Sequence, residues 1–452
     1  MRQMTLVAFL QAQNCTNFVG SWRHPDAAPD FMSAEYYRRI ARILEAGKFH
    51  VGFFDDRLAM PDRYGGDHEH TVANGIRCVK MDPITILTVM GMATERLGLA
   101  STCSTTYFEP FHVARVFATL DLMTNGRAAW NIVTSMNDGE AFNMGAASHG
   151  EHDQRYDRAD EFLEVVMGHW DSWDDDAIVL DKASGRFAHP EKVRRLDHTG
   201  TYFRSRGPFT VPRSAQGHPV LIQAGQSGRG RRFAARWAEL VFVNYHDLAS
   251  AKSDYAAFKT QVTEAGRDPT QAIVACGVYT VAAESRAEAE DRAALIDRLP
   301  KEIDCLSLLS EVLNADLATK PLDEPWSEEE IMQWTGVQGL RDRVFRLLGK
   351  RNPTTRDFMD ISRRGTFHDH PRFVGNAKDV ADGLEEWFAG HACDGFVVAA
   401  SHVPGAYEDF VRFVVPELQR RGLLHNDYAG TTLRENLGLD RPAIGSWHQV
   451  RA

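Results

Sequence analysis

The chain has 452 residues, of which 43% are hydrophobic and 25% charged, and its formal net charge is −11. This is an ordinary globular composition, and the acidic balance gives no electrostatic reason to bind nucleic acid or anionic lipid. No stretch approaches the ~20 apolar residues that a membrane helix requires, and the N-terminal apolar run is too short for a signal peptide. Six cysteines without CxxC spacing predict free thiols in a cytoplasmic protein, with no zinc site.

Short apolar runs alternate along the chain with longer segments of helical periodicity. The runs are apolar throughout, which is typical of parallel strands that are buried on both faces. We expect strands at residues 5–10, 51–54, 97–103, 128–133, 220–223, 240–243, 273–281 and 396–400. We expect helices at residues 34–46, 84–96, 113–123, 156–170 and 407–421. About eight strand–helix units predict an α/β fold that closes into a (β/α)₈ TIM barrel.

Two regions do not fit the strand–helix alternation. Residues 171–212 are rich in turn residues and acidic at 174–176, and residues 283–372 have mainly helical patterns between the seventh and eighth strands. No linker rich in Ser, Gly or Pro separates either region from the rest. We therefore predict a single domain over residues 1–452, with these two regions as insertions in the loops of the barrel.

Candidate functional residues follow from the rule that a TIM barrel carries its site at the C-terminal ends of its strands. The second strand ends at Asp55 and Asp56. The third strand contains polar residues, and the fourth is followed by more of them. These candidates are Thr102, Cys103, Ser104, Asn131, Thr134 and Ser135.

A glycine-rich turn follows the fifth strand, over residues 224–230 (AGQSGRG). Its backbone N–H groups, the N-terminus of the next helix and the hydroxyl of Ser227 would form a phosphate cradle, with Arg229, Arg231 and Arg232 nearby. A plain tight turn with Ser227 as helix cap is the alternative. The turn also approaches the GxSxG pattern of serine hydrolases, but Arg229 stands where that pattern requires glycine.

A second polar segment, residues 151–158, begins a helix. His152 and Tyr156 lie four residues apart and would share one helix face, where both can form hydrogen bonds to a ligand. The alternative is a solvated, salt-bridged helix start. The triplet His368-Asp369-His370 has no third ligand at a recognisable spacing, so we expect a polar loop there and no metal site.

Many segments, in the same order, resemble one family. They are residues 104–107 (STTY), 114–121 (ARVFATLD), 125–127 (NGR), 130–135 (WNIVTS), 151–156 (EHDQRY), 158–162 (RADEF), 172–173 (SW), 212–213 (PR), 216–220 (QGHPV), 223–225 (QAG), 414–422 (VVPELQRRG) and 432–439 (TLRENLGL). The chain resembles the nitrilotriacetate, dibenzothiophene sulfone and long-chain alkane monooxygenases of the bacterial-luciferase-like class over residues 4–439.

The resemblance implies a two-component monooxygenase with O₂ as co-substrate. A separate NAD(P)H:FMN reductase would supply reduced FMN, a flavin peroxide would oxygenate the substrate, and the chain would form a homodimer or homotetramer. Carried over by motif, the FMN contacts would be Asp56, Thr102, His152, Tyr156 and Ser227, with Thr134, Ser135 and Gly225 as secondary contacts. Because such chemistry requires a dry site, residues 283–372 are a candidate lid.

The chain departs from the family at the expected substrate pocket, and no catalytic residue is assigned. Histidines of the sulfone and alkane enzymes are missing after the first strand, where the chain reads Asn14-Cys15-Thr16-Asn17-Phe18, and at Met136. Phe53 and Phe108, with the pocket candidates Cys15, Phe18, Tyr107 and Met136, favour an apolar or aromatic substrate such as a sulfone, haloaromatic or alkane-like compound. Arg57 and Arg63 would instead pair with an aminopolycarboxylate.

Two further readings of the same barrel stay open. One is a flavin-binding protein without catalytic activity, which would be consistent with the missing histidines. The other is a deazaflavin-dependent dehydrogenase, although the motifs favour FMN.

Overall fold

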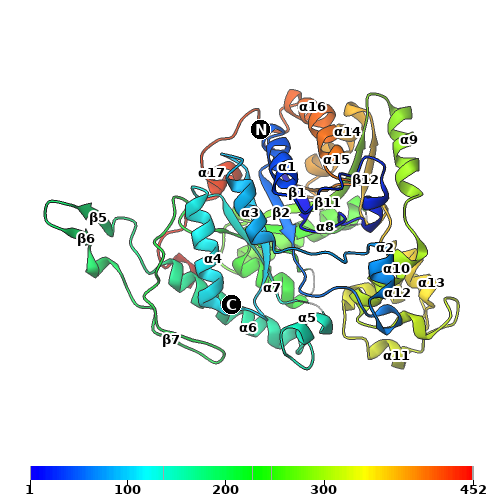
Figure 1. The fold of residues 1–452 in the computed structure, drawn as a ribbon, viewed down its shortest axis with the longest axis horizontal. Coiled ribbons are helices and arrows are strands. Elements are labelled where there is room, and N and C mark those ends of the chain that lie inside the picture. The colour runs from blue at the N-terminus through cyan, green and yellow to red at the C-terminus, as the bar shows by residue number, and fades with distance from the viewer. Residues whose placement is uncertain (1, 136, 226–227, 246, 450–452) are drawn as a thin grey trace.

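Eight parallel strands close into a barrel in the computed structural model, which describes residues 2–135, 137–225, 228–245 and 247–449 (Figure 1). The strands bond in the order β1-β2-β3-β4-β9-β10-β11-β13, and β13 pairs with β1 to complete the ring. The predicted TIM barrel is thereby confirmed. The barrel strands are β1 (Thr5–Gln11), β2 (Val51–Asp55), β3 (Gly98–Ser104), β4 (Ala128–Val133), β9 (Val220–Gln223), β10 (Leu240–Val243), β11 (Ile273–Ala282) and β13 (Gly395–Ala399).

The barrel strands are buried on both faces, which explains their apolar sequences. Alternate residues fill the barrel interior, where the ring of Phe53 stacks on Phe9 at 5.5 Å between ring centroids and meets Phe242 at 4.6 Å. The residues between them face the surrounding helices, as Leu6 and Leu10 do in the cluster that includes helix α1. Each strand therefore lacks the alternation of a half-exposed sheet.

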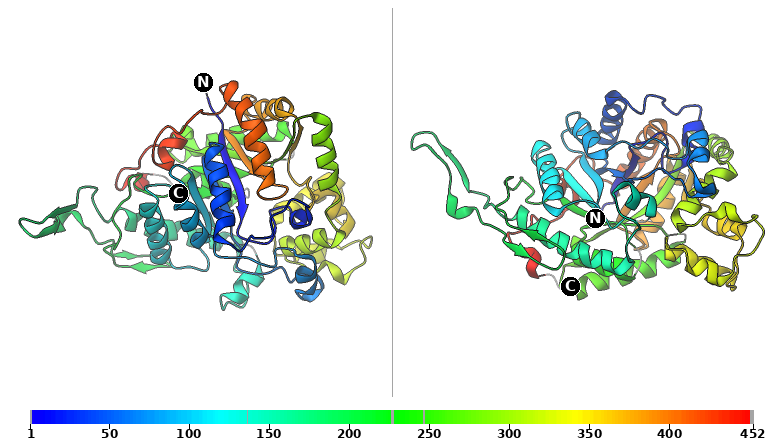
Figure 2. Two further views of the ribbon diagram at one scale, coloured as in Figure 1. Left: turned by 45° about the horizontal axis from the view of Figure 1, so that its top comes forward. Right: turned by 60° about the horizontal axis from the view of Figure 1, so that its bottom comes forward.

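Helices surround the barrel (Figure 2). They are α1 (Ala34–Ala46), α2 (Glu69–Asn74), α3 (Pro83–Gly91), α4 (Pro110–Met123), α5 (Asp138–Asn143), α6 (His152–Trp170), α7 (Gly228–Trp237), α8 (Leu248–Glu264), α14 (Ala377–Ala389), α15 (Gly405–Asp409), α16 (Val415–Arg420) and α17 (Leu433–Leu437). Among the described residues, no helix is both long and apolar enough to cross a membrane.

Four of the five expected helices differ in extent: α4 and α6 begin earlier than expected, at Pro110 and His152, and the other two differ more. The helix expected at 84–96 ends at Gly91. There Arg127 Nη2 donates hydrogen bonds to the carbonyls of Gly91 and Thr94, at 3.0 and 2.9 Å, in place of the N–H groups of a further helical turn. The helix expected at 407–421 is divided into α15, a π-helical segment at Phe410–Val414, and α16. Pro416 lacks the N–H that a continuous α-helix would need there, and the wider π turns precede it.

The two insertions take different forms. Residues 171–212 contain two antiparallel pairs that project from the body, β5 (Ile178–Asp181) with β6 (Arg186–Ala188) and β7 (His198–Thr199) with β8 (Arg204–Ser205) (Figure 1). Residues 283–372 form helices with a small core of their own, and end in a strand that extends the sheet beside β11. These elements are α9 (Arg286–Asp297), α10 (Glu302–Leu313), α11 (Glu328–Met332), α12 (Gln338–Leu348), α13 (Thr355–Ser362) and β12 (Arg372–Gly375).

Several of the recognised motifs lie at the N-terminal ends of the barrel strands, away from the expected site. The carboxylate of buried Asp121 accepts from the N–H of Ala128 at 2.8 Å and from Gln216 Nε2 at 2.6 Å. Arg434 forms a two-pronged ion pair with Glu239 at 2.6 and 2.8 Å. In a TIM barrel this face serves stability, so these motifs hold the fold together.

Candidate active site

Polar residues of β3 and β4 lie side by side at the C-terminal end of the barrel. Asn131 Nδ2 donates to Thr102 Oγ1 at 2.7 Å, and the hydroxyls of Ser104 and Ser135 lie 2.9 Å apart. Ser135 has a φ of +61°, in the left-handed region that non-glycine residues seldom adopt. Such strain gathers at functional sites. The carbonyl of Thr134 accepts from Thr106 Oγ1 at 2.8 Å, and the Thr134 side chain is buried beside this group.

The two aspartates at the end of β2 differ in charge. Burial raises the pKa of Asp56 to about 7, and the N–H of Arg57 donates to its Oδ1 at 2.9 Å. Burial also opposes the charge of Asp55, but Lys80 at 2.7 Å outweighs it and lowers the pKa of Asp55. At neutral pH, Asp55 is therefore a paired carboxylate, whereas Asp56 is divided between its acid and its anion and can donate or accept.

The glycine turn after β9 meets helix α6 near its start. A Cβ added to Gly225 would lie 2.8 Å from the hydroxyl of Tyr156 and would also clash with Gln223 Nε2. The Gly225 N–H donates to Gln223 Oε1 at 2.7 Å. The ring of Tyr156 packs on Phe233 of α7 at 5.5 Å and on His152 at 5.1 Å. Ser227 lies outside the described residues.

The arginines that follow this turn are engaged with carboxylates. Arg229 pairs with Asp157 at 3.0 Å and with Asp160, both on α6. Arg231 pairs with Asp254 at 3.1 Å. These pairs join α7 to α6 and α8 and partly neutralise the charge that Arg229 and Arg231 bring near the turn. Backbone N–H groups and the helix N-terminus remain as its anion-binding elements.

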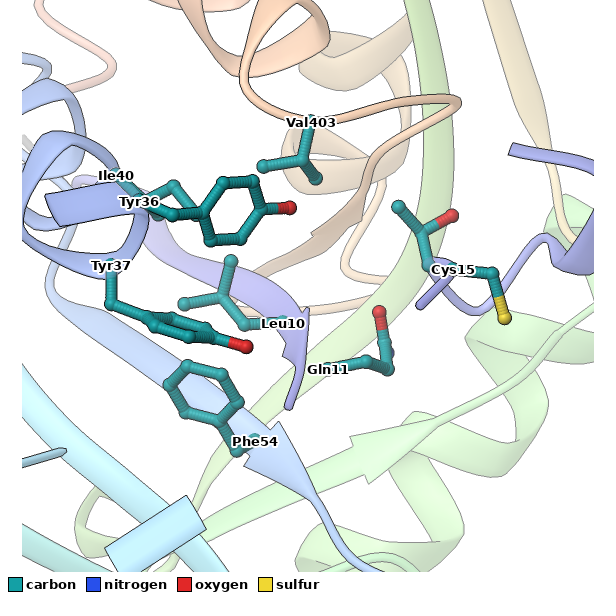
Figure 3. Close-up of a pocket in the computed structure, with 9 residues that line it drawn as sticks. Leu10, Gln11, Cys15, Tyr36, Tyr37, Ile40, Phe54 and Val403 are labelled. Carbon is teal, nitrogen blue, oxygen red and sulfur yellow. The ribbon is translucent and has the colours of Figure 1, made fainter. Parts of the chain in front are cut away.

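The expected pocket residues separate in the structure. Cys15 is buried, its thiol pKa is raised to about 11 by burial, and it lines a small cavity between β1 and α1 together with Gln11 and Tyr37 (Figure 3). Phe18 is fully buried against Phe367, with ring centroids 5.5 Å apart, and belongs to the core. Tyr107 is half-buried, and its hydroxyl lies 2.8 Å from His149 Nδ1. Met136 lies outside the described residues.

The two arginines considered as substrate ligands are bound within the protein. Arg57 forms an ion pair with Glu311 of α10, and Arg63 Nη2 lies 2.6 Å from Asp138 Oδ2. Asn314 accepts from Arg63 Nε at 2.9 Å. Both arginines therefore link the insertion at 283–372 to the loops around the site, and neither is available for a substrate carboxylate.

Sequence reasoning missed two buried side chains after the first strand: Asn17 and Arg77. No motif or spacing singles them out, because they come together only through the fold: Asn17 follows β1, whereas Arg77 precedes α3. Arg77 Nη2 donates to Asn17 Oδ1 at 3.0 Å. The one available signal would have been a charged residue at a position where the pattern of apolar residues predicts burial.

One cluster in the described residues has the composition of a metal site. Ligand atoms of His24, Asp26 and His402 lie within 4.8 Å of one another. The two imidazole rings stack face to face, with centroids 3.7 Å apart and planes 3° from parallel. Stacked rings direct their nitrogen lone pairs side by side instead of toward a common point, so this cluster is poorly arranged to coordinate an ion.

Several buried polar atoms near the C-terminal end of the barrel have no hydrogen-bond partner within the described structure. They are Gln11 Nε2 and Oε1, Asn131 Oδ1, Glu311 Oε2 and His370 Nδ1. Buried polar groups are almost always satisfied. With the acid of Asp56 and the hydroxyls of Thr102 and Tyr156, these atoms suit a ligand that is polar at its edges, as the pyrimidine ring and phosphate of FMN are.

Comparison with known proteins gives concordant matches. Residues 13–392 match the family model described as luciferase-like monooxygenase. The chain is 43% identical to the dibenzothiophene-sulfone monooxygenase of Rhodococcus erythropolis, over 98% of both chains. It is 39% identical to nitrilotriacetate monooxygenase component A of Aminobacter aminovorans, over 94% of both chains. The crystal structure of a riboflavin lyase with modified FMN superposes with a TM-score of 0.88 at 28% identity and covers all of both chains.

Proposed function

The chain belongs to the luciferase-like monooxygenase family, and from that premise we propose that it is the oxygenase component of a two-component system that uses reduced FMN and O₂. A separate NAD(P)H:FMN reductase would supply the reduced flavin. The proposal is supported by one relative that is named as component A and by the structural neighbour that contains modified FMN.

The observation that carries the proposal is the meeting of the candidate residues at one end of the barrel. Asp56 follows β2, Thr102 lies in β3, Ser135 follows β4, and Gly225 follows β9 against Tyr156. Parallel strands place all their C-terminal ends on the same face. Residues far apart in the sequence therefore lie on one face of the barrel, which supports a common site.

Different groups of residues would bind different parts of the flavin. The backbone around Gly225 and the N-terminus of α7 would hold the phosphate, and Tyr156 and His152 would border it. Asp56, Thr102 and the Ser104–Ser135 pair would form hydrogen bonds to the polar edge of the ring. Reduced FMN supplies the two electrons that O₂ activation requires, so that one oxygen atom enters the substrate and the other leaves as water.

The insertion at 283–372 would serve as the lid that excludes water. Glu311 and Asn314, at the end of α10, hold Arg57 and Arg63 of the loop that follows β2. Asp316, in the same insertion, accepts from the N–H of Gly65 at 2.9 Å. These contacts hold the insertion against the loop after β2, where it would exclude water from the site.

The wider setting is also part of the proposal. All six cysteines are free thiols, which supports a reducing cytoplasm. The arm at 171–212 exposes apolar side chains at Ile178, Leu180 and Phe187, and supports a homodimer or homotetramer in which a second copy covers them.

An apolar or aromatic substrate would contact Tyr107 and Phe108. Phe18 and Phe53 are occupied in the core, which weakens that preference and leaves a carboxylate-bearing substrate as the alternative.

Anaerobic titration with reduced FMN tests the cofactor assignment. We expect saturable binding at one site per chain, and tighter binding of reduced than of oxidised FMN. Oxygenation of a substrate in the presence of a reductase, with ¹⁸O from labelled O₂ in the product, would establish the reaction. Binding without incorporation of oxygen into any member of a substrate panel would favour the flavin-binding protein without catalytic activity.

A further inference from the structure

A short exposed segment, residues 144–150, crosses the rim of the barrel at the candidate site. This rim segment links α5, which follows β4, to the start of α6, where Tyr156 lies against the glycine turn. All of its residues except His149 are exposed. A Cβ added to Gly145 or to Gly150 would meet nothing within 4 Å. The rim segment therefore has open space around both of its glycines.

One residue attaches the middle of the rim segment to the rest of the protein. His149 Nδ1 lies 2.8 Å from the hydroxyl of Tyr107, and the His149 N–H donates to Asp138 Oδ1 at 2.9 Å. In the described structure, its neighbours Ala147 and Ser148 form no hydrogen bond to another element. The bond between His149 and Tyr107 is thus the contact that joins this stretch to the end of the barrel.

Tyr107 belongs to the polar group at the ends of β3 and β4. The residue before it, Thr106, donates from Oγ1 to the carbonyl of Thr134 at 2.8 Å. The Thr106 N–H donates to Ser104 Oγ at 3.1 Å. The backbone beside Tyr107 is therefore fixed to both strands, and His149 is bonded to a firm point of the candidate site.

The bond itself is weak. Burial and the charge of Arg155 lower the pKa of His149 to about 4, so its imidazole is uncharged at neutral pH. A hydrogen bond between two neutral side chains changes an equilibrium by roughly 2- to 12-fold. Tyr107 is only half-buried, so water can replace its partner. Separation of the rim segment from Tyr107 therefore costs little free energy.

The insertion at 283–372 is held far more firmly. The guanidinium of Arg23, which lies after β1, donates to both carboxylate oxygens of Asp304 on α10, at 2.6 and 2.9 Å. These two side chains are 12% and 0% exposed. Arg57 and Glu311 form a second buried ion pair. Separation of such pairs leaves buried charges without compensation, so the rim segment opens at a lower cost than the insertion.

An oxygenase that receives reduced FMN from a separate reductase binds and releases flavin in every turnover, so its site has to open repeatedly. We propose that the rim segment is the gate through which flavin passes, and that the hydrogen bond between Tyr107 and His149 is the latch that closes it. The inference rests on the proposed function and adds a conformational step to it. Gly145 and Gly150 are the hinges, because glycine adopts widely different backbone angles. The insertion stays in place while the gate opens.

Hydrogen exchange of the protein without flavin tests the latch. In Tyr107→Phe and in His149→Ala, the amides of the rim segment should exchange about three- to tenfold faster than in wild type, while those of α10 stay unchanged. His149→Asn should restore most of the protection, because its side-chain amide can bond to the Tyr107 hydroxyl. Tyr202→Phe, at an exposed tyrosine of the arm, is the matched control and should have no effect. Equal exchange in wild type and in both latch variants would overturn the proposal.

The kinetics of flavin binding test the gate. Anaerobic stopped-flow mixing with reduced FMN measures kon and koff. Both should rise about three- to tenfold in Tyr107→Phe and in His149→Ala, because the open form is more populated, while Kd changes less than about threefold. A rise in koff alone would mean that these side chains merely contact the flavin, which overturns the gate. His149→Asn should return both rate constants toward the wild-type values.

The remaining outcomes separate the gate from the proposed function. Faster exchange of the rim segment with unchanged kon would show that flavin enters elsewhere, which refutes the gate and leaves the function intact. Failure of the wild-type protein to bind reduced FMN would refute the proposed function itself. Should His149→Ala unfold, Tyr107→Phe still decides the question, because it removes the same hydrogen bond by the loss of one oxygen atom and keeps the aromatic ring.

Discussion

Arg57 and Glu311 form an ion pair between the loop after β2 and helix α10, although they lie 254 positions apart in the chain. Their side chains are only 14% and 4% exposed. A buried pair of this kind holds its two elements in one arrangement, and loss of one partner leaves the other as an uncompensated buried charge. The insertion at 283–372 is thereby joined to the site that it would cover.

Removal of the acid should therefore loosen the insertion. Glu311→Ala is expected to destabilise the protein by about 3–5 kcal/mol, because Arg57 loses its partner. Hydrogen exchange of α10 to α13 should become faster than that of the barrel strands. Glu328→Ala, which removes an exposed pair with Arg351 in the same insertion, should cost less than about 1 kcal/mol. Unchanged exchange in Glu311→Ala would show that the pair does not anchor the insertion.

The partly buried acid of Asp56 should leave a signature in the pH dependence of stability. Its pKa rises from an ordinary 3.8 to about 7 in the fold. Between these values the unfolded chain loses its proton while the folded chain keeps it, so the free energy of unfolding falls as pH rises from about 4 to 7 and is level above. Denaturant unfolding should show this slope in wild type relative to Asp56→Asn. Parallel curves for the two proteins would contradict the assignment.

Gly225 is expected to be intolerant of a side chain. Alanine there would press on the Tyr156 hydroxyl and on Gln223, and would displace the turn that is expected to hold the phosphate. We expect Gly225→Ala to weaken reduced FMN binding at least tenfold and to cost about 1–3 kcal/mol in stability. Gly339→Ala, where a Cβ meets nothing within 4 Å, is the control. Unaltered flavin affinity in Gly225→Ala would remove this turn from the site.

The pair between Arg434 and Glu239 should matter for stability alone. It lies at the N-terminal end of the barrel, where Arg434 is 3% exposed. Arg434→Met should lower the free energy of unfolding by about 3–5 kcal/mol and leave the flavin affinity of the folded protein unchanged. Arg441→Met breaks an exposed pair with Asp175 and should cost about 1 kcal/mol or less. Equal effects of the two substitutions in thermal unfolding would contradict this view.

The projecting arm predicts the oligomeric state. Leu180 and Phe187 are 61% and 60% exposed in the single chain, which is unfavourable unless a partner covers them. Serine at both positions should shift the protein toward monomers in sedimentation velocity, with little change in stability. Met332→Ser, at an exposed site on α11, should leave the distribution unchanged. A wild-type protein that is monomeric at high concentration would refute the predicted homo-oligomer.

The sequence predicts the barrel well because strands that are buried on both faces are continuous apolar runs in the sequence. The strands at 128–133, 220–223 and 240–243 have their predicted bounds, since apolar runs end there at polar or turn residues. β12 was not predicted, because its four residues, three of them half-buried, form no apolar run, and the strand forms only by pairing with β11. The apolar periodicity of residues 407–421 predicts one continuous helix and does not reveal the break that Pro416 causes.

The candidate site could be proposed from the sequence only where its residues follow strand ends or a recognised motif. Asp56, Thr102 and Gly225 have such positions. Glu311 does not, because it acquires its role from a contact with Arg57 across 254 positions, which no local pattern records. The same limit applies to Arg57, whose charge suggested a substrate ligand until its partner in the insertion was known.

The central claim is that this barrel binds reduced FMN for reaction with O₂, and one measurement tests it most directly. Purified protein is titrated anaerobically with reduced FMN and then mixed rapidly with oxygenated buffer, while the flavin absorbance is followed. We predict tight binding, followed by a transient species whose spectrum differs from those of reduced and oxidised FMN and whose decay is slower than reoxidation of free flavin. Absence of binding, or reoxidation at the rate of free flavin with no transient species, would contradict the account.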